Sequence, residues 1–184
     1  NVQGRANGSP DLTTSTFPLG GEVGYVATEE WVELVSGRVA TPSTHVEFGG
    51  GTGWGVDSQI RFTVVSSNWQ ESDRLMASVM TAVGAPTKPF AVDGYGSLEG
   101  VMLGEMTSPR IDADFVGQDL RAWNVEWGTG RGEFLVENSF LNVSSGVFGR
   151  GRAELQVDGR FSLATPRNDD LEEMNAVVKM VSFP

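Results

Sequence analysis

The sequence contains no cysteine, one histidine and only two lysines. Without thiols the chain can form no disulfide scaffold, no thiolate zinc site and no cysteine nucleophile. It also lacks a run of about 18 apolar residues, so we expect no transmembrane helix. The formal net charge is -11. A chain this acidic is repelled by phosphate backbones, and we therefore expect no nucleic-acid partner.

Glycine is abundant, at 24 of 184 residues, or about 13% against a usual value near 7%. The glycines lie at the ends of apolar runs, where turns and bulges need positive φ angles. A hydrophobic content of 39% supplies enough apolar surface to offset the entropy of ordering the chain, which excludes gross disorder. At 184 residues the chain fits one ordinary domain or two small ones.

Alternation of apolar and polar residues with period two is the dominant pattern, and it predicts strands with one apolar and one wet face. An antiparallel sheet covered on one side produces such strands. The apolar positions of the clearest alternating segments are Val46, Phe48, Ile60, Phe62, Val64, Leu98, Met102, Ile111, Phe115, Leu155 and Val157.

One segment departs from this alternation and predicts a helix. Asn68 followed by Glu71 is a capping-box variant. Leu75, Val79 and Val83 then recur at every fourth residue, on one helical face. We expect an amphipathic helix that ends at the glycine and proline just beyond.

The helix divides the chain into three parts. We expect a first strand unit over 1–67, the amphipathic helix over 68–84 and a second strand unit over 85–184, within one continuous β domain. The stretch Ala176–Phe183 predicts a last strand. The chain begins without an initiator methionine, and we interpret it as a piece of a longer protein.

A strand pattern occurs twice, 109 residues apart. Trp31–Gly50 and Phe140–Gly159 each contain an apolar strand, a Ser-Gly break, a short connector and an alternating strand. The breaks are Ser36-Gly37 and Ser145-Gly146. Two such units favour a repeated architecture over a fold built around one catalytic pocket.

The sequence contains residue types that can act in catalysis or metal binding, but their spacing matches no catalytic motif. His45 falls on a wet strand face, where an exposed histidine is expected. The glycine run Gly49–Gly55 has no Gly-Lys-Ser/Thr sequence, so we interpret it as a flexible connector, not a phosphate loop. Asp112 and Asp114 share a wet face without metal-ligand spacing. We expect a protein that is not an enzyme and has no metal and no cofactor.

Several stretches together resemble the repeating segments of the TamB family, the translocation and assembly module subunit of bacterial envelopes, and of related AsmA-like proteins. The shared pattern is a Gly-x-apolar-x-Gly strand, a small-residue-Pro break, an alternating strand and an Asp-Gly type of turn. The segments that carry it are 38–50, 92–104, 108–111, 117–123, 130–140 and 151–163.

The resemblance implies an elongated antiparallel sheet curled into an open, apolar-lined trough, a β-taco, within an inner-membrane-anchored periplasmic protein. Such proteins carry phospholipid between the inner and outer membranes, or support outer-membrane protein assembly and secretion. The implied partners are phospholipid acyl chains and a TamA-like outer-membrane barrel. The implied lipid-groove lining is the set of eleven apolar positions given above.

Two other functions compete with this one. The alternation equally describes a closed β-sandwich, as in a structural or adhesin-like domain of a secreted protein. A carbohydrate-active β-sandwich enzyme is the third alternative, and it lacks an identifiable acid/base pair. The resemblance favours the open trough.

Overall fold

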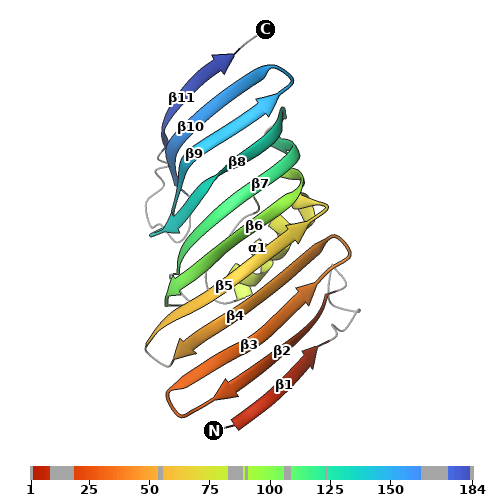
Figure 1. Cartoon of the computed structure of the whole chain (residues 1–184), viewed down its shortest axis with the longest axis vertical. Coiled ribbons are helices and arrows are strands. Elements are labelled where there is room, and N and C mark those ends of the chain that lie inside the picture. Colours follow the sequence, from red (N-terminus) through yellow and green to blue (C-terminus); the bar gives the residue numbers. More distant parts are fainter. Residues whose placement is uncertain are drawn as a thin grey trace.

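All the strands that the structure describes belong to one antiparallel sheet, in which each strand pairs with its neighbours in chain order (Figure 1). The two chain ends therefore lie at opposite ends of an elongated molecule. The expectation of a mainly β, open antiparallel sheet with one short helix is confirmed. The strands form one sheet, not two stacked sheets, so the described residues do not adopt a closed sandwich. The structure is a computed structural model and describes residues 2–8, 19–53, 56–82, 89, 91–105, 109–122, 124–162 and 174–182.

Eleven strands and one helix make up the described chain. In order they are β1 (Val2–Gly8), β2 (Gly20–Ala27), β3 (Trp31–Ala40), β4 (Thr44–Gly53), β5 (Val56–Ser66), α1 (Trp69–Ala82), β6 (Asp93–Gly104), β7 (Arg110–Ala122), β8 (Val125–Glu137), β9 (Phe140–Arg150), β10 (Ala153–Ser162) and β11 (Met174–Ser182).

Strand register aligns the apolar positions into rows that cross the sheet. Val46 lies directly across from Val64, which lies across from Leu98, which in turn lies across from Phe115. Because successive side chains of a strand point to opposite faces, this row and its neighbours form one apolar face. β5 and β6 pair with each other directly. Helix α1 is therefore inserted between two strands that pair with each other, and it does not interrupt the sheet.

Helix α1 begins where its capping residue predicts. The Asn68 side-chain oxygen accepts hydrogen bonds from the backbone N–H groups of Gln70 at 3.1 Å and Glu71 at 3.3 Å, as an N-cap does. The expected return contact of the capping box is not made. The backbone N–H of Asn68 donates to the Ser66 hydroxyl at 3.0 Å, and the Glu71 carboxylate turns to the loop between β3 and β4, where the backbone N–H of Ser43 donates to it.

The internal repeat corresponds to two equivalent hairpins, β3–β4 and β9–β10. Gly37 lies across from Phe48, and 109 residues later Gly146 lies across from Val157. Both hairpins also change register at the same place. The prediction that each Ser-Gly pair interrupts a strand is wrong. Each pair lies within a continuous strand, at a β-bulge. A bulge accommodates the extra residue and increases the local twist without ending the strand.

The glycine run after Phe48 is also strand and not connector. β4 continues to Gly53, and its glycines pair with both β3 and β5. A Cβ atom on Gly51 would lie 1.7 Å from the indole of Trp31. The absence of a side chain therefore lets this aromatic ring cover the strand. The remaining two residues of the run, 54 and 55, lie outside the described residues.

The core lies between α1 and the apolar face of the sheet. Its buried members are Val64, Trp69 and Leu120. The Trp69 and Phe115 rings are 5.4 Å apart between centroids, so the first residue of the helix packs against the sheet. Figure 1 shows α1 behind β5 and β6, near the middle of the sheet, with strands on both sides left uncovered by it.

Candidate functional site

The eleven apolar positions predicted from the sequence lie on the strands from β4 to β10, and register places them on one face. Phe48 lies across from Phe62, and Ile60 lies across from Met102, which lies across from Ile111. Ile60 and Val64 are buried, and the other nine are half-buried. The structure thus brings the predicted set together as one surface.

Helix α1 divides this set into two groups. One group packs into or against the cluster that holds Trp69, and so lies in the core next to the helix. The other six positions are outside that cluster. The first group is Val46, Phe62, Val64, Leu98 and Phe115, and the second is Phe48, Ile60, Met102, Ile111, Leu155 and Val157.

Several aromatic residues of the same face were missed by the sequence reasoning. Phe134 stacks on Phe115 with 5.3 Å between ring centroids, and Trp127 lies 5.5 Å from Phe148. Leu135 separates Phe134 from Val136 and breaks the alternation, which hides this strand from a period-two search. The aromatic rings extend the apolar face from β7 to β9.

The other face of the sheet is hollowed into a groove of about 980 Å³. It runs from β3 to β9, and its lining includes five carboxylates and two guanidinium groups. The bulged residues Val35 and Ser144 border it. The charged lining residues are Arg38, Glu47, Arg61, Glu99, Asp112, Asp114 and Glu133.

Three of these carboxylates form a row across neighbouring strands. Glu99 lies directly across from Asp114, and Asp114 lies directly across from Glu133. Like charges in this relation repel each other. Glu47, farther along the groove, is paired with Arg38 at 3.3 Å. The electrostatic potential of the groove is therefore most negative over β6, β7 and β8.

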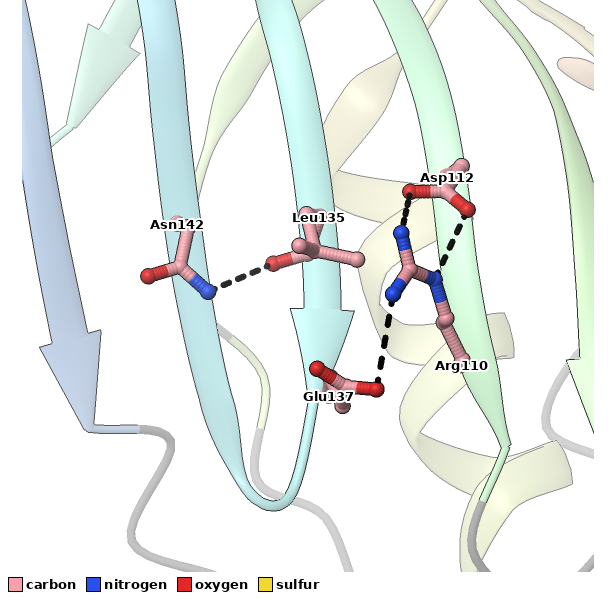
Figure 2. Close-up of polar contacts among 5 residues, drawn as sticks. All are labelled: Arg110, Asp112, Leu135, Glu137 and Asn142. Atoms are coloured by element: carbon pink, nitrogen blue, oxygen red, sulfur yellow. Dashed lines mark hydrogen bonds and ion pairs between the residues drawn. The ribbon is translucent and has the colours of Figure 1, made fainter.

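A group of polar contacts on β7, β8 and β9 shares Asp112 and Leu135 with the lining of the groove (Figure 2). Arg110 donates to both carboxylate oxygens of Asp112, at 3.0 and 3.2 Å, and forms an ion pair with Glu137 at 3.6 Å. The hydrogen bond and the charge of Asp112 raise the pKa of Arg110. The Asn142 amide donates to the Leu135 carbonyl at 3.5 Å. These contacts join three strands on the wet face.

The helix is held to the sheet by a polar network at its N-terminus. The Thr41 hydroxyl and the Ser43 backbone N–H both donate to the Glu71 carboxylate. Partial burial raises the pKa of Glu71, but the hydrogen bonds from Thr41 and Ser43 outweigh it and lower the pKa from 4.5. On the next helical residue, Ser72 is hydrogen-bonded to Thr44 at 2.8 Å. This network fixes the end of α1 that carries Trp69.

His45 is exposed and contacts Glu47 at 3.4 Å. In the described part of the chain, no group of three histidine or carboxylate residues is arranged to hold a metal ion. Within the same residues, no helix combines the length and hydropathy needed to cross a bilayer.

Comparison of the chain with family models, with curated proteins and with solved structures gives no match.

Proposed function

We propose that this protein is a non-enzymatic segment of a TamB-like periplasmic protein, in which the apolar face of the sheet carries phospholipid between the inner and outer membranes. One observation carries the proposal. Eleven strands follow one another in a single open sheet, and their register aligns the apolar residues into rows that run from strand to strand. Such a surface offers acyl chains an apolar path along the long axis of the molecule on either side of helix α1.

The energetics of acyl chains support this choice. Each methylene group removed from water contributes about 0.8 kcal/mol of binding free energy. An acyl chain that lies along several rows therefore gains more binding free energy from burial than a compact polar ligand would. The backbone groups of the strands are already paired within the sheet, and an apolar ligand therefore leaves no hydrogen bond unmade. The matching hairpins β3–β4 and β9–β10 indicate that the surface extends by repetition of a unit.

The partners follow from the same proposal. Phospholipid acyl chains contact the apolar face on either side of α1, where Phe48 and Val157 lie outside the Trp69 cluster. In an envelope setting the segment also supports outer-membrane protein assembly and secretion, together with a TamA-like outer-membrane barrel.

Site-specific photo-crosslinking tests the proposal. A photo-reactive residue replaces Phe48 or Val157 in the purified chain, which is incubated with vesicles of phosphatidylethanolamine and phosphatidylglycerol. We expect lipid adducts at both positions, since they occupy equivalent places in the two hairpins.

Matched controls come from the neighbouring residues, Glu47 and Gln156, whose side chains point to the other face. Few adducts are expected there. Absence of adducts at all four positions contradicts lipid contact. Adducts at the two controls alone assign the lipid to the opposite, polar face of the sheet.

A further inference from the structure

Trp69, the first residue of helix α1, has a buried polar atom without a hydrogen-bond partner. The residue is 8% exposed, and none of the residues that the structure describes accepts a hydrogen bond from its indole Nε1–H. A donor buried in this way has lost the hydrogen bond that it makes to water at an open surface. The contact between α1 and the sheet therefore contains a group that gains a partner when the helix moves away.

The sheet does not depend on α1 for its strand pairing. β5 and β6, the strands before and after the helix, pair directly with each other. The helix can therefore leave the sheet without breaking a strand pair. Its attachment consists of the packing of its apolar face, including Trp69, and of hydrogen bonds made by Glu71, Ser72 and Asp73. Water can replace each of these hydrogen bonds.

Helix α1 covers part of the face on which the proposed function places acyl chains. The row beneath it crosses β4, β5, β6 and β7, and its residues lie in or against the Trp69 cluster. These residues are Val46, Val64, Leu98 and Phe115. Another row of the same face, that of Ile60, Met102 and Ile111, is outside the cluster. The helix thus narrows the apolar path without closing it.

We propose that α1 is a displaceable cover, which phospholipid acyl chains remove from the row of Leu98 when they occupy it. This inference rests on the proposed function and adds a regulatory element to the same site. Acyl chains and the apolar face of α1 make the same kind of contact with this row, so that one occupant excludes the other. The exchange also satisfies Trp69, since the released indole N–H donates to water or to an ester carbonyl of the lipid.

A disulfide between α1 and the sheet tests whether the helix must move. The hydroxyl oxygens of Thr44 on β4 and Ser72 on α1 are 2.8 Å apart, so cysteines at these two positions lie within reach of a disulfide bond. The chain has no cysteine of its own. Ser72 is about one helical turn from Trp69, and the disulfide therefore holds the turn that carries the indole. The reduced form of the Thr44→Cys/Ser72→Cys variant is the matched control for the oxidised form.

Photo-crosslinking identifies what occupies the covered row. Photo-leucine, a diazirine analogue close to leucine in shape, replaces Leu98 beneath the helix or, as a matched control, Leu155 on β10, which lies outside the Trp69 cluster. Both forms of the full chain are incubated with vesicles of phosphatidylethanolamine and phosphatidylglycerol. When the disulfide forms, we expect lipid adducts at Leu98 to fall at least about fivefold and those at Leu155 to change less than about twofold.

The other outcomes separate a failure of the cover from a failure of the lipid path. Adducts at Leu155 with none at Leu98 in either form, or equal adducts at Leu98 in both forms, overturn the cover and leave the proposed lipid path in place. An equal fall at both leucines also overturns the cover, because the disulfide then acts on the whole surface. Absence of adducts at both leucines in both forms contradicts the proposed function and this inference together.

Glu71→Gln tests the same cover without cysteines. It weakens the attachment of the helix N-terminus to Thr41 and Ser43. We therefore expect adducts at Leu98 to rise about threefold, while those at Leu155 stay the same. Unchanged or fewer adducts at Leu98 in this variant overturn the proposal.

Discussion

Asp114 on β7 lies directly across from Glu99 on β6. Glu133 on β8 lies across from Asp114 on its other side. The central strand of the groove thus carries a carboxylate between two others. Cross-strand pairs of like charge reduce stability by a few tenths of a kcal/mol each.

Asp114→Asn removes both repulsive pairs and is expected to raise the unfolding midpoint in urea. The gain is expected to shrink in about 0.5 M salt, which screens exposed charges. Asp112→Asn is the matched control on the same strand and face. It breaks the contact with Arg110 and is expected to lower the midpoint or leave it unchanged. If the unfolding midpoint rises equally in both variants, the repulsion is not specific to Asp114.

Glu71→Gln is expected to destabilise the protein at pH 7 by about 1 kcal/mol, since it weakens charge-assisted hydrogen bonds from Thr41 and Ser43. The pKa of Glu71 is lower in the folded protein than its ordinary value of 4.5. The stabilisation is therefore fully present above about pH 4.5 and is lost as the pH falls through the lower, folded value.

The stability difference between Glu71→Gln and wild type is thus expected to narrow in acid, as urea unfolding at a series of pH values will show. Glu29→Gln, an exposed carboxylate in the turn between β2 and β3, controls for the loss of one negative charge. A difference that stays constant to pH 3 would contradict the role of the ionised carboxylate.

Gly50→Ala is expected to destabilise the sheet by more than about 2 kcal/mol. Gly50 has a φ of +138°, and an added Cβ would lie 2.0 Å from the Gln59 carbonyl oxygen of the neighbouring strand. Both the backbone strain and the steric clash oppose the change. Gly20→Ala is the control, because nothing lies within 4 Å of the corresponding Cβ position. Thermal unfolding of the two variants measures the contrast, and equal midpoints would show that β4 relaxes freely.

The alternation in the sequence predicted strands such as β4, β5 and β7 and their faces, because a side-chain period of two depends only on local geometry. The helix start was predictable for the same reason, since Asn68 caps the N–H groups of its own first turn. The partner of Glu71 was not predictable. That carboxylate reaches Ser43, 28 residues away in sequence, and only the pairing of β4 with β5 brings the two together.

The groove on the wet face is a second feature that could not be predicted from the sequence. The Ser-Gly pairs were interpreted as strand ends, but each lies at a bulge inside a strand. Bulges change the twist of a sheet, and the accumulated twist of many strands decides which face becomes hollow. Alternation distinguishes the two faces of a strand but carries no information on the direction in which the sheet bends.

The proposed lipid path predicts that a carboxylate on the apolar face impairs lipid binding more than one on the adjacent wet position. Met102 and Val101 are both half-buried residues of β6 with side chains on opposite faces. Met102 lies outside the Trp69 cluster, so its substitution leaves the core around the helix in place. Met102→Glu is expected to lower fluorescent phospholipid binding at least about tenfold, because burying a charge against acyl chains costs several kcal/mol.

Val101→Glu places the same charge in the groove, across from Arg61, and is expected to change lipid binding little. Urea unfolding of both variants identifies the conditions in which each is folded, and binding is compared only there. Equal loss of binding in the two folded variants would contradict a path on the apolar face. Loss in Val101→Glu alone would place the lipid in the groove, next to the carboxylate row of β6, β7 and β8.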